Sequence, residues 1–265
     1  MESHIPGWRR LWLHVLAALV LFFLVVPTLI VIPMSFSSAN ALTFPPPGWS
    51  LRWYEEFFSK PQWQDATWVS IRVAALTMLL ATPIGTAAAY VLHVGRFGFS
   101  TALYGTIIAP LMVPVILIGL GVYFLYARLD MVNTIAGLVL VDTILAVPFV
   151  LVTVGAGLQS YDMNQEMVAR SLGASRLRAF LTVTLPQIRY SVIAGALLAF
   201  IVAFDEVVIA LFISGGDGAT LTKRMFSSLR DEVDPTIAAI STILIFAATI
   251  PPLVLQILAN RRKTP

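Results

Sequence analysis

Residues 166–186 read EMVARSLGASRLRAFLTVTLP, and this polar, arginine-rich stretch interrupts an otherwise very apolar chain. Gly173 is followed thirteen residues later by Pro186, with Val183 and Leu185 just before the proline. The pattern predicts two short helices joined by a turn. A membrane protein that keeps such a segment between two spans usually offers it to a soluble partner. We therefore expect the chain to be one component of a larger assembly.

The composition indicates a membrane protein. The chain has 265 residues, of which 58% are hydrophobic and 12% charged, and its mean hydropathy is +0.86. Soluble domains are roughly 45–50% apolar and about 25% charged. The chain has no cysteine, which excludes disulfides, thiolate metal sites and iron–sulfur clusters. The net charge of +3 is too small to suggest nucleic-acid binding.

Six apolar segments are long enough to cross roughly 30 Å of hydrocarbon. They are residues 11–33, 67–92, 101–126, 134–157, 191–214 and 236–259. The first segment exceeds the apolar core of a signal peptide, which runs about 7–15 residues, so we expect it to be retained. The sequence thus predicts an all-α, multi-pass membrane protein whose single domain covers 1–265, with a polar loop at 158–190.

Basic residues favour one orientation of these spans. One side of the membrane would carry Arg9, Arg10, Arg96, Arg170, Arg176, Arg178, Arg189, Arg261, Arg262 and Lys263. The other side would carry fewer, namely Arg52, Lys60, Arg72, Arg128, Lys223, Arg224 and Arg230, together with most of the acids. Both termini and the 158–190 loop are therefore predicted to be cytoplasmic.

The polar loop contains signals for the ends of its helices. Asp162 or Asn164 can cap a first helix over 165–172, because a short polar side chain accepts from the free N–H groups there. Gly173 can end that helix in a left-handed conformation. Ser175 can cap a second helix that runs until Pro186. Two such amphipathic helices could also lie on the lipid surface.

The loop resembles the signature loop of permeases from binding-protein-dependent ABC importers. The family pattern is Glu-Ala-Ala, three residues, Gly, nine residues, Ile, one residue, Leu-Pro. The positions that agree are Ala169, Gly173, Val183, Leu185 and Pro186, whereas Met167 and Val168 replace the family Glu and Ala, and Glu166 lies one residue early. The resemblance implies that the loop docks into a groove of an ATPase subunit. The coupling residues it implies are Glu166, Ala169, Arg170, Gly173, Ala174, Leu185 and Pro186.

The chain is most similar to the second permease of spermidine/putrescine-type importers. This resemblance is carried by Phe204-Asp205-Glu206-Val207-Val208, Phe212-Ile213-Ser214-Gly215, Thr220-Leu221 and the stretch 234–242. It implies an inner-membrane location among lipids and three kinds of protein partner: a homologous permease, two ATPase subunits and an extracytoplasmic solute-binding protein. It also implies a polyamine or another small organic cation as solute. Amino-acid derivatives and ferric or thiamine-like ligands stay open.

Four residues are candidates for the translocation path. Asp205 and Glu206 lie inside an apolar segment, where charges are costly and tend to be functional. Asp142 invites the same interpretation in its own span, and Tyr123 could present an aromatic face to a cation. The alternatives for the acids are a buried ion pair or a hydrogen-bonded strut, with Arg72 or Arg128 as partner, and the alternative for the tyrosine is ordinary packing.

The chain contains no Gly-x4-Gly-Lys-Ser/Thr motif, so we expect no cofactor in it and assign ATP and Mg²⁺ to the partner ATPase. No His/Asp/Glu cluster has metal-ligand spacing. An intramembrane aspartyl protease is disfavoured because Asp217 follows Ser214-Gly215-Gly216, which predicts a loop. A gradient-driven secondary transporter would not need the 166–186 loop. The sequence therefore predicts a transport subunit and not an enzyme.

Overall fold

The computed structural model describes residues 11–95 and 98–261, except the side chains of 217 and 251–261. Within these residues the secondary structure is helical, and Ser37 and Trp49 form an isolated β-bridge outside any strand. The all-α prediction is confirmed. Arg9, Arg10, Arg96, Arg262 and Lys263 lie outside the described residues, so the cytoplasmic placement of the termini stays a prediction.

Several described helices can cross a membrane by length and composition. Three do so alone, namely α1 (Leu11–Ser35), α3 (Pro61–Val94) and α6 (Ile135–Gln159), and up to five do if each of two bent helix pairs counts as one span. The apolar helix from Thr236 to Ile250 is shorter than these three. The count of six spans stays a prediction.

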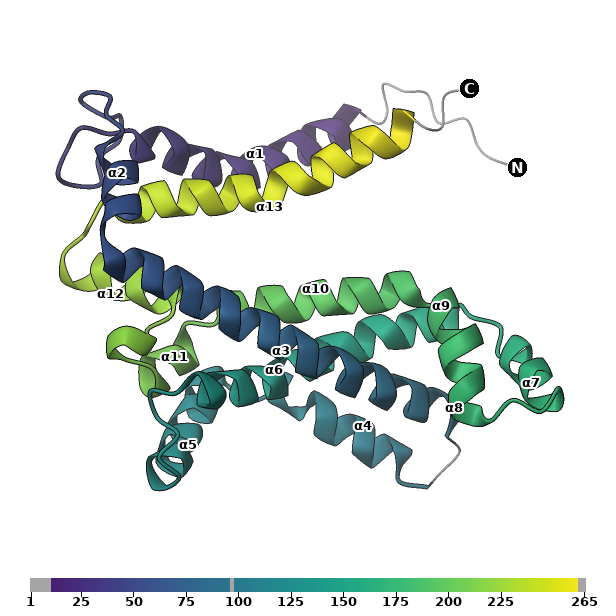
Figure 1. The fold of residues 1–265 in the computed structure, drawn as a ribbon. Coiled ribbons are helices and arrows are strands. Elements are labelled where there is room, and N and C mark those ends of the chain that lie inside the picture. The colour runs from purple at the N-terminus through teal and green to yellow at the C-terminus, as the bar shows by residue number, and fades with distance from the viewer. Residues whose placement is uncertain (1–10, 96–97, 262–265) are drawn as a thin grey trace. The chain divides into compact units, whose positions relative to one another are not determined.

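The chain divides into two compact units, of which the first comprises Met1–Pro61 and Ser227–Pro265. In this unit α1 lies along α13 (Thr236–Arg261), and α2 (Arg52–Ser59) packs against the start of α13 (Figure 1). The large apolar side chains of α1, such as Phe22 and Phe23, are exposed over most of its length. Such a helix is suited to contact with lipid tails. The single-domain prediction for 1–265 stays untested.

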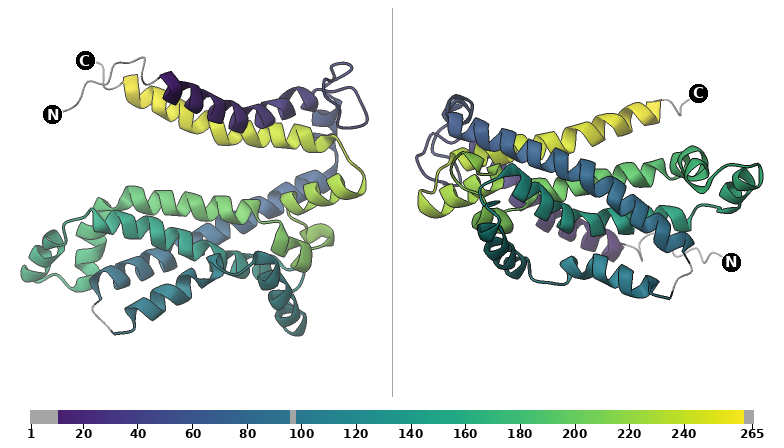
Figure 2. Two further views of the ribbon diagram at one scale, coloured as in Figure 1. Left: turned by 180° about the vertical axis from the view of Figure 1, so that it is seen from behind. Right: turned by 60° about the horizontal axis from the view of Figure 1, so that its bottom comes forward.

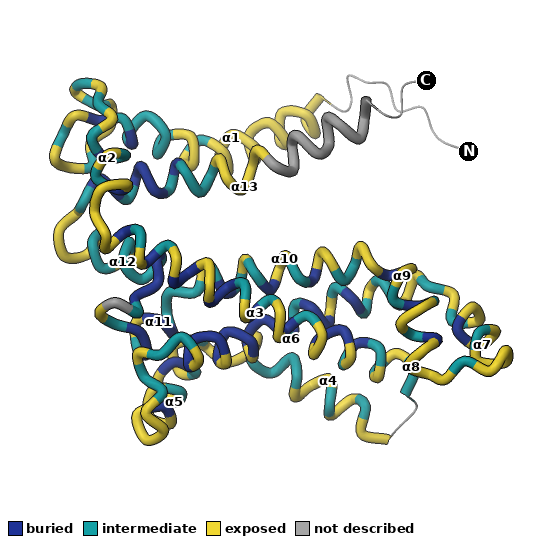
Figure 3. Tube along the Cα trace, in the orientation of Figure 1, coloured by how far each residue is buried: buried dark blue, intermediate teal, exposed yellow. Residues whose placement is uncertain are grey.

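The second unit, Gln62–Phe226, is built around the pair α6 and α10 (Arg189–Asp205), which pack together along much of their length (Figure 1). Figure 3 shows that α6 is largely buried. Gly195 lets α10 approach α6 closely, because a Cβ there would lie 3.3 Å from Val150 of α6. Gly85 does the same for α3, where a Cβ would lie 2.6 Å from the Val150 Cβ. Small residues commonly mediate helix packing in membranes.

Two predicted spans are not continuous helices. In the segment 101–126, α4 (Ser100–Ile108) passes into the 3₁₀ turn η2 (Ala109–Leu111), and α5 (Val115–Arg128) follows after a bend of 94°. Pro110 and Pro114 lie at this break, where neither can donate a backbone N–H. In the segment 191–214, α10 ends at Asp205, and the short α11 (Val208–Ile213) begins three residues later.

The candidate site residues lie toward two opposite ends of the second unit. The polar loop, with α7 (Asn164–Ser171), α8 (Arg176–Ala179), η3 (Phe180–Thr184) and α9 (Leu185–Gln187), lies beyond one end of α6 and α10 (Figures 1 and 2). The opposite end carries α11, the turn η4 (Gly216–Gly218) and the start of α12 (Leu221–Asp231). The α6–α10 pair therefore connects the loop to the break beside Asp205.

Candidate functional site

The first helix of the polar loop, α7 at Asn164–Ser171, begins and ends one residue before the predicted range 165–172. The Asp162 carboxylate accepts from the Asn164 N–H at 3.0 Å, just before α7. At the other end Gly173 has φ +92°, and the Ala174 N–H donates to the Ala169 carbonyl at 3.1 Å. This hydrogen bond closes around Gly173 and satisfies the Ala169 carbonyl, which would otherwise lack a partner at the end of the helix. The predicted turn at Gly173 is confirmed.

The second helix contains a wide turn. Ser175 Oγ accepts from the Arg178 N–H at 3.3 Å and caps α8, as predicted. The chain then forms the π-helical segment η3 and remains helical past Pro186 as α9. The helix was expected to stop at Pro186. A wider turn before the proline relieves the clash that its ring makes with the carbonyl four residues earlier.

Glu166 is the buried centre of the loop, with 1% of its surface exposed. Its Oε1 accepts from the Tyr90 hydroxyl at 2.5 Å, and its Oε2 accepts from the Thr184 hydroxyl at 2.6 Å. Tyr90 belongs to the last turns of α3, whereas Thr184 ends η3. One carboxylate therefore joins three segments. Tyr90 and Thr184 are 76 and 18 residues from Glu166 in the sequence, so local sequence patterns do not predict these hydrogen bonds.

The exposed side of the loop, called its outer face below, carries mainly apolar and basic side chains. Its apolar side chains Met167, Val168, Leu172, Leu177 and Leu181 are exposed, Leu172 to 85%. Arg170, Arg176 and Arg178 are exposed beside them. A cluster of exposed apolar side chains on one surface marks an interaction site. Met167 and Val168, which depart from the family pattern, thus extend this apolar face.

Asp205 and Glu206 have separate roles at the break after α10. Asp205 is the last residue of α10 and is exposed. Glu206 is half-buried; its Oε1 accepts from the Ile209 N–H at 2.6 Å and thereby caps α11. The predicted span 191–214 is therefore interrupted after Asp205, because Glu206 accepts from an N–H group of a new helix instead of extending α10.

Contacts from outside the break hold α11 at both ends. The Thr222 hydroxyl donates to the Glu206 carbonyl at 3.2 Å. At the far end the Asn133 N–H donates to the Ile213 carbonyl at 2.8 Å, and Lys223 Nζ donates to the Ser214 carbonyl. Burial lowers the pKa of Lys223. These contacts stabilise the break between α10 and α11.

Asp142 lies inside the protein with 2% of its surface exposed, and one of its carboxylate oxygens has no hydrogen-bond partner among the described residues. Glu206 is near enough to act on it electrostatically. Among the described side chains no cation forms an ion pair with either acid, and Arg72 and Arg128 are exposed. The alternative of an ion pair with Arg72 or Arg128 is therefore not found among the described residues.

Tyr123 of α5 is 38% exposed, and its ring packs edge-on against Phe124 with 5.8 Å between centroids. Of the four candidates for the translocation path, Asp205 and Tyr123 reach the surface, Glu206 is half-buried and Asp142 is enclosed. The structure does not gather all four around one pocket.

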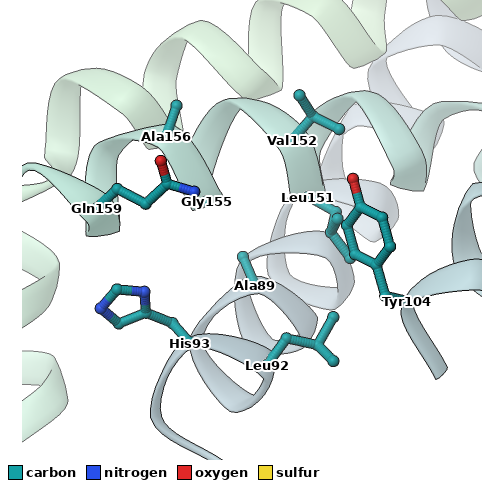
Figure 4. Close-up of a pocket in the computed structure, with 9 residues that line it drawn as sticks. All are labelled: Ala89, Leu92, His93, Tyr104, Leu151, Val152, Gly155, Ala156 and Gln159. Carbon is teal, nitrogen blue, oxygen red and sulfur yellow. The ribbon is translucent and has the colours of Figure 1, made fainter. Parts of the chain in front are cut away.

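A pocket of about 330 Å³ lies between α3, α4 and α6 (Figure 4). Its lining is mostly apolar, with polar atoms from His93, Tyr104 and Gln159. A second pocket of about 630 Å³ adjoins the start of α7, and the Tyr161 hydroxyl that lines it is buried without a partner. Neither pocket includes Asp142, Asp205 or Glu206 among its lining residues.

Comparisons with known proteins agree with the resemblance. Residues 81–264 match the family described as "Binding-protein-dependent transport system inner membrane component". The chain is 34% identical to the putrescine transport system permease protein PotI of Escherichia coli K12, over 94% of this chain and 90% of PotI. It is 29% identical to the spermidine/putrescine permease PotC of Haemophilus influenzae, over 84% and 86% of the two chains.

A solved structure shares the fold. It is a chain of a bacterial ABC transporter involved in the import of the acidic polysaccharide alginate, with a TM-score of 0.68 and 14% identity. The match covers 100% of this chain and 99% of that one.

Proposed function

The chain belongs to the family of inner-membrane components of binding-protein-dependent transport systems, and from this premise we propose that the solute it carries is a polyamine or a similar small organic cation. The protein is a multi-pass permease subunit of an ABC importer and not an enzyme. The solute is proposed because the similarity to the putrescine permease extends over nearly the whole of both chains.

The position of Asp205, at the break between α10 and α11, supports a cationic solute. Asp205 is exposed at the end of α10 and forms no ion pair within the described residues. A carboxylate in an apolar span attracts a cation and repels an anion. Tyr123, also exposed, can add an aromatic face for an ammonium group. Asp142 and Glu206 would contribute negative potential from inside the protein.

Competition for uptake tests the solute. Cells that lack their own polyamine uptake would express the chain with its ATPase, sister permease and binding protein, and labelled putrescine would be offered with unlabelled competitors. We expect excess putrescine or spermidine to abolish labelled uptake, and amino-acid derivatives, thiamine and ferric complexes to leave it intact. No uptake of labelled putrescine, together with uptake of a labelled member of the latter group, would transfer the proposal to that class of solute.

We also propose that the loop 158–190 couples the permease to an ATPase. Its outward residues combine an apolar patch with arginines, which suits an apolar groove with an acidic rim. Burying a leucine-sized side chain in such a groove contributes about 1.5–3 kcal/mol. Glu166, Ala169, Gly173 and Ala174 shape the first helix and its turn, whereas Leu185 and Pro186 lie in α9, which continues the second helix.

The remaining partners follow from the same proposal. Two ATPase subunits would bind ATP and Mg²⁺, since the chain has no P-loop sequence. A homologous permease would complete the path, and an extracytoplasmic binding protein would deliver the solute. Membrane lipid would surround the exposed apolar faces of the helices, and nucleic acid is not a partner.

A further inference from the structure

We propose that Glu166 is a positioning residue that clamps the coupling loop onto the end of α3, so that movement of the loop is delivered to α3 through Tyr90. This inference rests on the coupling role proposed above for the loop. It assigns Glu166 a task within its own chain and excludes it from the ATPase contact.

The first support is the geometry of the carboxylate. A buried carboxylate is costly unless it is hydrogen-bonded, and here each oxygen accepts one short bond from a hydroxyl. Thr184 has no exposed surface, so water does not compete for its bond to Glu166. The carboxylate is therefore held from both sides, by α3 and by η3.

The second support is the set of contacts that Tyr90 makes with the rest of the loop. Its ring lies 4.5 Å from the ring of Phe180, the first residue of η3. The guanidinium of Arg176 lies 5.9 Å from the Tyr90 ring, within the range of a cation–π interaction. One residue of α3 thus contacts α7, α8 and η3, and a displacement of any of them acts on α3.

The third support is the direction of Glu166. Its side chain is enclosed, while the next two residues, Met167 and Val168, are 53% and 60% exposed on the outer face. A partner that docks on this face meets apolar side chains and not the carboxylate. Loss of the carboxylate is therefore expected to leave docking intact and to weaken the connection between loop and span.

The test separates docking from transmission. The complete importer would be purified with Tyr90→Phe, Thr184→Val or Glu166→Gln, and placed in proteoliposomes. Two readouts are taken: the ATPase retained in the complex, and the ATP hydrolysed per solute transported. Tyr104→Phe and Thr106→Val are matched controls, because both side chains are exposed, both lie outside the 158–190 loop and neither contacts Glu166.

We expect Tyr90→Phe and Thr184→Val to retain the ATPase and to raise the ATP hydrolysed per solute by roughly fivefold or more, since each removes a hydrogen bond to a charged group. Both controls are expected to match the wild type. Glu166→Gln is expected to be milder than either, because an amide can still bond to both hydroxyls.

An unchanged ratio in both Tyr90→Phe and Thr184→Val overturns the inference, as does loss of the ATPase from either. Gly173→Val, which alters the docking surface itself, distinguishes this failure from failure of the coupling role. If Gly173→Val releases the ATPase while the clamp variants transport normally, only the clamp is wrong. If Gly173→Val also has no effect, the coupling role is wrong.

Discussion

Asp205 and Glu206 are adjacent in the sequence, but their carboxylates lie in different surroundings. Glu206 directs its carboxylate back to the Ile209 N–H, whereas Asp205 remains exposed at the end of α10. The sequence predicts two charges in an apolar segment but not this division of roles. A carboxylate that precedes an apolar helix by two or three positions is nonetheless a capping signal, and it could have revealed the break.

Neutral replacements at these positions are expected to have different effects. Asp205→Asn should lower uptake of a cationic solute by up to about fivefold with no change in thermal stability, because an exposed charge beside a cation contributes roughly 0.2–1 kcal/mol. Glu206→Ala should lower stability by about 1 kcal/mol, since it removes a helix cap. Uptake assays and thermal unfolding of the purified complex measure the two effects. Unchanged uptake with Asp205→Asn would remove Asp205 from the path.

Among the elements, the polar loop is the part that local sequence best predicts. The turn at Gly173 and the cap at Ser175 depend on neighbouring residues, and both are found. The inward direction of Glu166 depends on Tyr90, which is distant in the chain, so local patterns do not reveal it. Likewise, Pro110 and Pro114 indicate a weak point between α4 and α5 but not a bend of 94°.

The turn between the loop helices gives a prediction at this scale. A Cβ on Gly173 would meet no heavy atom within 4 Å, so a substitution there acts through the backbone alone. Gly173→Val should release most of the ATPase from the purified complex, because a β-branched residue disfavours the left-handed conformation by about 1–2 kcal/mol or more. Gly173→Asn is the matched control, since Asn tolerates that conformation, and it should retain the ATPase. Equal retention by both variants would contradict the role of the turn.

At the scale of the whole molecule, composition and apolar segments are enough to predict an all-helical membrane protein. They do not reveal where helices break, because a break depends on single capping residues such as Glu206 and on contacts such as that of Asn133 with Ile213, which are distant in the chain. Asp142 illustrates the same limit: its sequence position resembles that of a path residue, yet its side chain is enclosed by the core. The proposed solute rests instead on the similarity of the chain to putrescine and spermidine/putrescine permeases.

The most direct test of the account is ATP-driven uptake of labelled putrescine into proteoliposomes that contain this chain, its sister permease and its ATPase, with the binding protein present. The account predicts uptake that requires ATP, Mg²⁺ and the binding protein, and that fails when Gly173→Val replaces the wild-type chain. Uptake that continues without ATP or the ATPase, driven by an ion gradient alone, would contradict it.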